Sequence, residues 1–349
     1  MGCLFKLGGN SVKKYKTSTF KNVIDRFKKK NVVVIGDLLL DHYIWGDVSR
    51  ISPEAPVPVV WVKNEGYLPG GACNVANNLV ALGADVSVIG VVGDDEKGEM
   101  LRDLMEKKNI FTEGVFIDKK RSTIVKTRVI AHHQQIVRID REDTNEIGTG
   151  YLKKVQAFLQ EKIKKVDGVI IEDYGKGVIT PALLRIVMPI AKKYKKMVAV
   201  DPKEDHFSYY KGVSVITPNN HEAEKAVGFR IKTSKDLNKA GDIMLKKMKA
   251  EVVLITLGEE GMIVFSKGKQ PYKIPTLAQE VFDVSGAGDT VVATYALSKI
   301  CGASSIISAH IANCAAGIVV GKVGAAVVSD RELMGRIRAE IKAPIKSLR

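Results

Sequence analysis

A short run near the C-terminal end, "VFDVSGAGDTVVATYAL", places three small residues and one acid before an apolar segment typical of a helix: Gly286, Ala287, Gly288 and Asp289. The first backbone N–H groups of a helix have no partner inside it, so they attract anions, and small residues leave the approach open. Asp289, one turn further, can accept a proton from a hydroxyl group beside that anion. The run predicts an anion hole with a general base attached, as phosphoryl transfer requires. The alternative is a Gly-rich helix start that Asp289 merely caps.

Two acids, Asp37 and Asp41, follow the first apolar strand-like run at 32–36. Ligands of open α/β sheets bind at the carboxyl ends of the strands. An ionised acid at this edge can accept hydrogen bonds from two sugar hydroxyl groups. An Asp after a strand is also a common turn former or helix cap, so the residues alone leave both interpretations open.

The segment "LPGGACNVANN" contains a third group of polar and small residues. Gly70 and Gly71 permit close approach to the backbone, and Asn74 lies on the first turn of the helix that follows. A side-chain amide beside exposed N–H groups can bind hydroxyl groups. A simple glycine turn before a helix is the equally weighted alternative.

Several classes of protein are excluded by patterns that the chain lacks. The first strand is not followed by GxGxxG, and GxxxxGK[ST] occurs nowhere, which excludes a dinucleotide-binding fold and a P-loop NTPase. The four cysteines form no CxxC pair and no zinc spacing, which favours reduced thiols in a cytoplasmic protein. No apolar run approaches the roughly 18 residues of a membrane-spanning helix, and the N-terminus does not resemble a secretory signal, so we expect no membrane partner.

The net charge of +15 raises the question of nucleic acid, but the charge is concentrated at the two ends. Residues 1–30 contain nine Lys or Arg and one acid, residues 331–349 contain six and two, and the 300 residues between them carry only +3. Basic ends alone supply nonspecific attraction to phosphates. We therefore expect no specific nucleic-acid partner.

Apolar, β-branched runs alternate with helical patterns along most of the chain. Nearly continuous apolar strands between helices are typical of a parallel sheet covered on both faces, which predicts an α/β fold. The expected strands are 32–36, 86–93, 168–173, 197–201, 213–218 and 252–258.

Residues 43–68 and 114–140 break this alternation, because they contain strand-like runs with no helix between them. They predict β-hairpins that project from the main sheet as a small lid over a site, with an ordinary extension of the sheet edge as the alternative. Projecting strands leave unpaired edges and an apolar face, here including Val57, Val59 and Trp61, and such a face usually requires a partner.

Two separated stretches, "GGACNVANNLVALGADVSVIGVVG" and "DVSGAGDTVVA", resemble the first and second signatures of the ribokinase-like (PfkB-type) carbohydrate kinases. The resemblance continues through "DPK" at 201–203, "TPNNHE" at 217–222 and "TLGEEG" at 256–261, and covers residues 31–330. It implies an ATP-dependent carbohydrate kinase with a ribokinase-like, doubly wound, mostly parallel sheet flanked by helices, and a small β-lid.

Within that family the chain is most similar to the heptose 7-phosphate kinases of lipopolysaccharide precursor synthesis, through "GDLLLDHYIWGDVSRISPEAPVPVV", "EDYGKGV" and "NCAAGIVVGKVGAAVVS". In many such proteins a nucleotidylyltransferase domain with a GxFDxxHxGH-like motif follows the kinase, and this sequence contains no such motif. We expect the kinase domain alone over 18–342, with basic tails at 1–17 and 343–349. A separate nucleotidylyltransferase would act next.

The resemblance also implies roles for individual residues. Glu222, in an N-x-x-E motif, is expected to hold Mg²⁺ through water. Asp283 is expected to be structural or to belong to a monovalent-cation loop. Arg128 and Arg138 are candidates for gripping a distal phosphate, although each could equally be a solvated strand residue. The implied nucleotide-binding residues are Asn219, Asn220, His221, Glu222, Thr256, Gly258 and Asn313, and the implied sugar-binding residues are Asp41, Gly70, Gly71, Asn74 and Arg128.

Three functions follow from these observations. The first is an ATP-dependent kinase that phosphorylates the anomeric hydroxyl group of a heptose 7-phosphate. The second is a kinase of another sugar, sugar phosphate or nucleoside, because fold does not fix substrate. The third is a non-catalytic regulator that binds a sugar or nucleotide, and Asp289 argues against it because a binding protein needs no base. In relatives the lids of two subunits pair, so a homodimer through the lid is expected.

Overall fold

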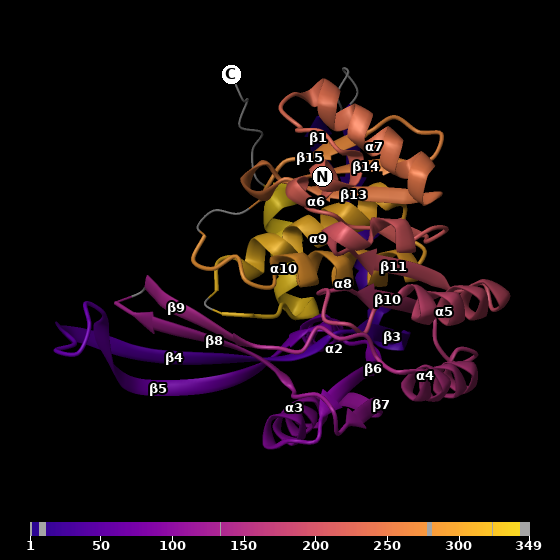
Figure 1. The fold of residues 1–349 in the computed structure, drawn as a ribbon. Helices are drawn as coiled ribbons and strands as arrows, with labels where there is room; N and C mark the ends of the chain where they lie inside the picture. The colour runs from indigo at the N-terminus through magenta and orange to yellow at the C-terminus, as the bar shows by residue number, and fades with distance from the viewer. Residues whose placement is uncertain (1, 7–11, 133, 278–280, 323, 343–349) are drawn as a thin grey trace.

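The computed structural model describes residues 2–6, 12–132, 134–277, 281–322 and 324–342. Across these residues a nine-stranded sheet runs in the order β15-β14-β13-β12-β11-β10-β3-β6-β7 (Figure 1). Neighbours from β7 to β13 pair in parallel, and β14 pairs antiparallel with both β13 and β15, which confirms the mostly parallel sheet. The strands are β3 (Asn31–Gly36), β6 (Asp85–Gly93), β7 (Ile110–Asp118), β10 (Gly168–Glu172), β11 (Met197–Asp201), β12 (Val215–Ile216), β13 (Val252–Thr256), β14 (Met262–Ser266) and β15 (Tyr272–Ile274).

Helices cover both faces of this sheet, because successive strand residues point to opposite faces. Val32 and Val34 of β3 pack into a core with α1, α2, α3, α8, α9 and α10, whereas Val33 and Ile35 pack into a second core with α4, α5, α6 and α7. Within the described residues, no helix is both long and apolar enough to span a membrane. The α-helices are α1 (Thr17–Ile24), α2 (Ala72–Ala81), α3 (Glu96–Lys107), α4 (Thr149–Lys162), α5 (Pro181–Lys193), α6 (Asn220–Val227), α7 (Ser234–Met248), α8 (Ala287–Ile300), α9 (Ser305–Val319) and α10 (Asp330–Lys342), and the 3₁₀ turns are η1 (Phe27–Lys29), η2 (Glu204–Tyr209) and η3 (Gly258–Glu260).

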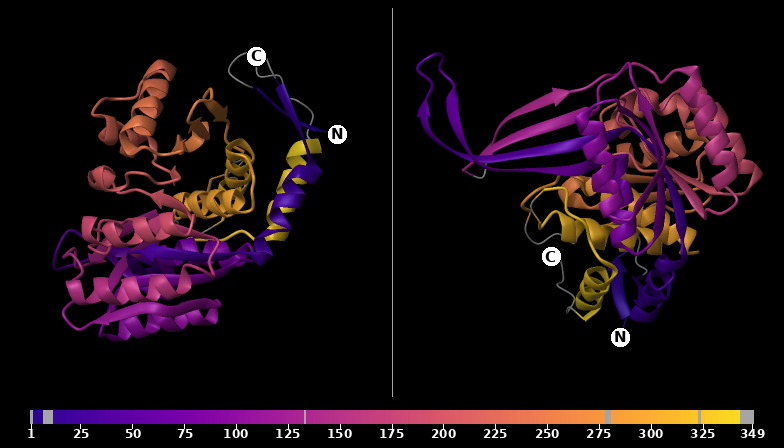
Figure 2. Two further views of the ribbon diagram at one scale, coloured as in Figure 1. Left: turned by 90° about the vertical axis from the view of Figure 1, so that its right-hand side faces the viewer. Right: turned by 90° about the horizontal axis from the view of Figure 1, so that it is seen from below.

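The N-terminal segment differs from the expected tail over residues 1–17. Strands β1 (Gly2–Lys6) and β2 (Val12–Lys16) pair antiparallel, and β1 contacts α10 (Figure 2, left). The Tyr15 ring centroid lies 6.2 Å from the Phe20 ring centroid of α1. The segment is therefore held by an aromatic contact, which its basic composition did not predict. The predicted tail at 343–349 lies outside the described residues.

The lid predicted from the broken alternation is a separate four-stranded sheet in the order β5-β4-β8-β9. It projects from the body of the molecule (Figure 2, right). The boundary at residue 114 was wrong, because residues 114–118 belong to β7 and pair with β6 in the main sheet. The lid strands are β4 (Leu38–Ile51), β5 (Pro58–Gly71), β8 (Ile124–Ala131) and β9 (Gln134–Arg141).

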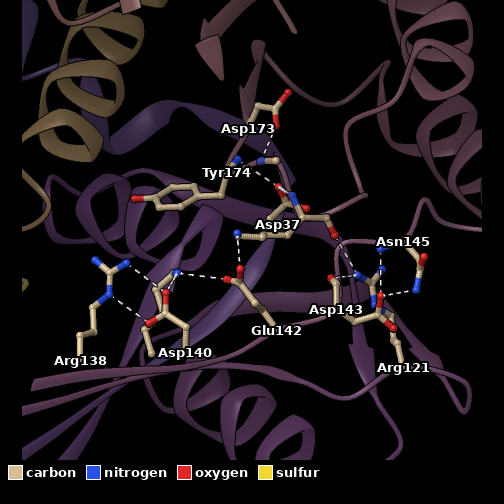
Figure 3. A network of polar contacts seen from close by, with 12 residues as sticks. Asp37, Arg121, Arg138, Asp140, Glu142, Asp143, Asn145, Asp173 and Tyr174 are labelled. Carbon is tan, nitrogen blue, oxygen red and sulfur yellow. Dashed lines mark hydrogen bonds and ion pairs between the residues drawn. The ribbon is translucent and has the colours of Figure 1, made fainter. Parts of the chain in front are cut away.

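Asp37 anchors the loop that follows β10. Its side chain is fully buried, and its carboxylate accepts hydrogen bonds from the backbone N–H groups of Tyr174, Lys176 and Val178, each at 3.0 Å (Figure 3). Burial and the neighbouring Asp173 raise the pKa of Asp37 to about 6. The suggestion that Asp37 binds sugar hydroxyl groups is therefore wrong, because its oxygens are committed to the backbone of residues 174–178.

Replacement of Asp37 by Asn should destabilise the protein. The amide offers one acceptor oxygen in place of two, and its NH₂ group would face a backbone donor, so at least one buried N–H loses its partner. We expect the free energy of unfolding in urea at pH 7.5 to fall by about 1–3 kcal/mol. Asp242→Asn, at an exposed position of α7, is the matched control and should leave that free energy unchanged. Equal stability of Asp37→Asn and the native chain would contradict the anchoring role.

Candidate active site

Helix α8 begins at the Gly-Ala-Gly run, as the sequence predicts. Gly286 precedes the helix with φ 76°, and a Cβ there would lie 2.7 Å from the Asn74 amide nitrogen, so only glycine fits. Among the described residues no side chain caps the first turn; the Ala287 N–H group donates to the Val284 carbonyl oxygen at 3.2 Å, whereas the N–H groups of Gly286 and Gly288 have no acceptor there. Asp289 lies inside the first turn, and its carboxylate accepts hydrogen bonds from side chains of two other segments, so its role is not limited to capping the helix.

The Asp289 carboxylate is 5% exposed and is held by two donors. The Asn74 amide of α2 donates to Oδ2 at 2.6 Å, and the Tyr174 hydroxyl group donates to Oδ1 at 3.1 Å. Burial raises the pKa of Asp289 to about 6, and the bonds from Asn74 and Tyr174 act in the opposite direction. A carboxyl group with this pKa is mostly ionised at neutral pH and still basic enough to accept a proton.

Two further acids lie beside Asp289, the buried Glu172 and the half-buried Asp201, and neither was predicted from the sequence. Carboxylate oxygens of Glu172, Asp201 and Asp289 lie within 4.8 Å of one another. Neither oxygen of Glu172 has a hydrogen-bond partner among the described residues, whereas Asp201 accepts from the Thr217 hydroxyl group at 2.6 Å. Burial, followed by the charge of neighbouring acids, raises the pKa values of Glu172 and Asp201 well above their usual range. Each is the last residue of a strand, so the rule used for Asp37 could have found them.

A cavity of 480 Å³ opens on the other side of the α8 N-terminus. Most of its wall is apolar, with Val284, Val291 and Met262 among the contributing side chains, so it suits a flat aromatic base. The Asn313 amide at its wall donates to the Pro275 carbonyl oxygen at 2.7 Å. Five residues singled out from the sequence line this cavity: Thr256, Gly258, Ala287, Gly288 and Asn313.

The N-x-x-E motif forms the start of α6. Asn219 accepts from the Glu222 N–H group at 2.9 Å, and the Glu222 carboxylate accepts from the Asn219 N–H group at 2.8 Å, which is a capping box. The Glu222 charge is close enough to raise the pKa of Asp201, so Glu222 lies at the edge of the acidic cluster. Asn220 and His221 lie on the same turn and do not line the cavity.

The residues expected to bind a sugar gather at the base of the lid. Asp41 of β4 forms an ion pair with Arg128 of β8, and a Cβ at Gly70 would overlap the Asp41 carboxylate. Gly71 has φ 56° and precedes α2, which presents Asn74 to Asp289. The structure thus brings all five together, but Arg128 already has a carboxylate partner.

Two other residues singled out from the sequence also have partners. Arg138 of β9 pairs with Asp140 at 3.0 Å, so neither of the two candidate arginines, Arg128 and Arg138, presents an uncommitted guanidinium group. The Asp283 carboxylate accepts from the N–H groups of Ser285 at 2.8 Å and Gly324 at 3.1 Å. These two bonds tie the segment before α8 to residue 324 and agree with a structural role for Asp283.

Comparison with known proteins gives a family match over most of the chain. Residues 29–331 match the family described as pfkB family carbohydrate kinase. The chain is 48% identical over 321 residues to the bifunctional protein HldE of Geobacter metallireducens, which covers 91% of this chain and 66% of that protein. It is 44% identical over 304 residues to the bifunctional protein HldE of Helicobacter pylori strain J99, with coverage of 87% and 65%. The chain thus spans about two thirds of the length of these relatives.

Solved structures share the fold at low sequence identity. The structure of Arabidopsis thaliana ribokinase complexed with ribose and ATP has a TM-score of 0.71 at 18% identity, covering 88% of this chain and 99% of that one. Escherichia coli phosphofructokinase-2 in complex with substrates and products has a TM-score of 0.75 at 18% identity, with coverage of 90% and 100%. These similarities confirm the predicted ribokinase-like fold.

Proposed function

This chain belongs to the pfkB family of carbohydrate kinases, and we propose that it transfers the γ-phosphoryl group of ATP to the anomeric hydroxyl group of a heptose 7-phosphate. The product would be a heptose 1,7-bisphosphate on the route to ADP-heptose for the lipopolysaccharide core. One observation carries the proposal. A buried, ionisable carboxylate, Asp289, is held in the first turn of a helix whose Gly288 N–H group has no acceptor among the described residues, between an apolar cavity and the base of the lid.

The proposed transfer follows from this arrangement. Asp289 accepts the proton of the anomeric hydroxyl group while that oxygen forms a bond to the γ-phosphorus. The bond between the γ-phosphorus and the bridging β–γ oxygen breaks, and its electron pair leaves with ADP. The N–H groups of Gly286 and Gly288, which have no acceptor among the described residues, would stabilise the negative charge on the transferred group. The cavity lined by Thr256, Gly258 and Asn313 would receive the adenine base.

Mg²⁺ fits the acidic residues beneath Asp289. The buried Glu172 oxygens have no hydrogen-bond partner among the described residues, and one of them lies within 4.8 Å of one Asp201 oxygen, a span that a hard cation could bridge. We propose that Glu172 and Asp201 would hold Mg²⁺, with Glu222 contributing through water, and that the bound ion would supply positive charge to the phosphates of ATP. A Cβ at Gly288 would lie 3.8 Å from an Asp201 oxygen, so the acids and the anion hole are neighbours. A monovalent cation stays a prediction.

The choice of a heptose phosphate rests on sequence rather than on geometry. The stretches around Asp41 and Tyr174, "GDLLLDHYIWGDVSRISPEAPVPVV" and "EDYGKGV", resemble the heptose 7-phosphate kinases, and the HldE relatives in the comparison are 44% and 48% identical. Another sugar or sugar phosphate is the second candidate, because the two arginines proposed to grip a distal phosphate, Arg128 and Arg138, are both paired with acids of the chain. We further propose that a nucleotidylyltransferase acts next on the sugar once hydrolysis has removed the 7-phosphate, and that these steps occur in the cytoplasm, where ATP is abundant.

We also propose that two copies of the chain pair through their lids. The lid exposes large apolar side chains on its outer strands, with Trp61 68% and Ile139 57% exposed. Isolated strands with such side chains usually pair with another chain. A lid shared between two copies would bury these side chains and close the site against water.

Loss of the base should abolish turnover without loss of nucleotide binding. Asp289→Asn should retain its fold and its affinity for an ATP analogue by calorimetry, and its kcat should fall about 10²–10⁴-fold because the amide cannot accept the proton. The assay is ATP-dependent phosphorylation of a panel of heptoses, hexoses, pentoses and their phosphates. Preference for a heptose 7-phosphate supports the proposal, and preference for another sugar supports the second candidate. A kcat within threefold of the native value would contradict the role of Asp289.

A charge on the lid face should separate the proposed dimer. Trp61→Asp should give monomers by light scattering at micromolar concentration, with a raised sugar KM, because a buried carboxylate without a partner opposes association. The matched control is Phe111→Asp, an exposed aromatic position on β7 outside the lid, which should leave the oligomeric state unchanged. A native chain that is already monomeric at this concentration would rule out the lid-paired dimer.

A further inference from the structure

Tyr174 contacts the proposed base and has no role in the function described so far. Its hydroxyl group donates to Oδ1 of Asp289 at 3.1 Å, while Asn74 holds Oδ2 at 2.6 Å. The two donors come from different parts of the fold, the loop after β10 and helix α2. A carboxylate held at one oxygen can still rotate about its last torsion, because that torsion is broad for Asp. A second donor at the other oxygen fixes the carboxylate plane.

The backbone around Tyr174 is fixed on the side of the main sheet. The Tyr174 N–H group donates to the buried carboxylate of Asp37 at 3.0 Å. Asp173, the preceding residue, accepts from the His206 ring at 2.8 Å and from the Tyr210 hydroxyl group at 2.5 Å. Gly175 follows with φ 68°, a conformation that places the turn directly after the tyrosine. Residues 173–175 therefore have little freedom to move the ring.

The same loop is also tied to the base of the lid. The Lys176 ammonium group lies 2.8 Å from Glu142, which follows β9, and the Lys176 carbonyl oxygen accepts from the Arg121 guanidinium group at 2.8 Å. Glu142 and Asp140 both pair with Lys126 of β8, at 3.3 Å and 3.0 Å. Figure 3 shows this polar network running from the lid strands to the loop that carries Tyr174. The tyrosine is thus held between two rigid parts of the molecule.

We propose that Tyr174 is a positioning residue for phosphoryl transfer: its hydroxyl group fixes the orientation in which the Asp289 carboxylate meets the substrate hydroxyl group. This inference rests on the proposed role of Asp289 as the base. The two bonds from Asn74 and Tyr174 occupy only part of the acceptor capacity of a carboxylate, which has about four lone-pair sites, so a site remains for the incoming proton. A general base must hold that site within hydrogen-bond reach of the proton it accepts, and a misoriented carboxylate loses rate rather than affinity.

Tyr174→Phe tests the proposal, because it removes the donor and keeps the ring. We expect kcat to fall about 10- to 100-fold, with the KM values for ATP and sugar within about twofold of the native values. The matched control is Tyr151→Phe, whose hydroxyl group donates to the Ile117 carbonyl oxygen outside the site, and which should keep native kinetics. An unchanged kcat in Tyr174→Phe, or a raised KM at native kcat, would overturn the proposal.

A double variant separates positioning from general structural damage. If Tyr174 acts through Asp289, Tyr174→Phe combined with Asp289→Asn should be no slower than Asp289→Asn alone. If the kcat of the double variant falls by the product of the two single losses, Tyr174 acts independently of Asp289, and the inference is overturned.

If the native chain phosphorylates none of the sugars, the proposed function fails. The native chain, the two single variants and the double variant are then compared by urea unfolding. Non-additive changes in unfolding free energy then support the link between Tyr174 and Asp289, and additive changes overturn it.

Discussion

Three carboxylates at the ends of neighbouring elements, of which Glu172 and Asp289 are buried and Asp201 is half-buried, are the constraint on which the site depends. Parallel pairing brings the carboxyl ends of β10 and β11 together, which places Glu172 beside Asp201, and Asp289 joins them from the first turn of α8. Burial, followed by the charge of neighbouring acids, raises the pKa values of Glu172 and Asp201 and favours a proton or a bound cation at these groups. Holding the carboxylates so close together destabilises the fold unless hydrogen-bond donors or a cation compensate. The arrangement therefore fits a cation site better than an ordinary core.

The surrounding structure supplies part of that compensation and fixes the geometry. Asn74 and Asn78 lie one turn apart on α2 and reach α8, where Asn74 holds Asp289 and Asn78 accepts from the Thr290 hydroxyl group at 2.9 Å. These bonds join the two helices through buried polar side chains. Unlike apolar packing, such bonds specify which residues must face each other. The base is therefore oriented before any substrate arrives.

Much of this site could be predicted from sequence because its parts are local. The Gly-Ala-Gly-Asp run, the Gly70-Gly71 turn and the strand pattern each predict a structure within a few residues, and the fold follows from their order. Contacts between distant segments could not be predicted in this way. Asp37 and Asp41 carry the same side chain after the same strand, yet one anchors a loop and the other pairs with Arg128. Only the spatial neighbours decide between these roles.

The same limit explains why Tyr174, Glu172 and the N-terminal hairpin escaped prediction. Tyr174 reaches Asp289 across 115 positions of sequence, and Glu172 acquires its importance from Asp201 on another strand. The basic composition of residues 1–17 predicts a solvated tail, but backbone pairing of β1 with β2 and the Tyr15 contact with Phe20 give it structure. Charge counts describe the average surroundings of a segment and contain no information about its pairing partner.

The most direct test of this account is whether the buried acids bind a divalent cation. Mn²⁺ is a suitable probe because it binds oxygen ligands as Mg²⁺ does and can be counted by EPR spectroscopy. Titration of the native chain should reveal one bound Mn²⁺ ion per chain. The affinity for Mn²⁺ should fall at least about 10-fold in Glu172→Gln, because the proposed carboxylate ligand of the cation is lost. The affinity should be unchanged in Glu161→Gln, a substitution at an exposed position on α4. Equal affinity in the native chain and Glu172→Gln, or no bound Mn²⁺ in the native chain, would contradict the claim that these carboxylates form a cation site beside the base.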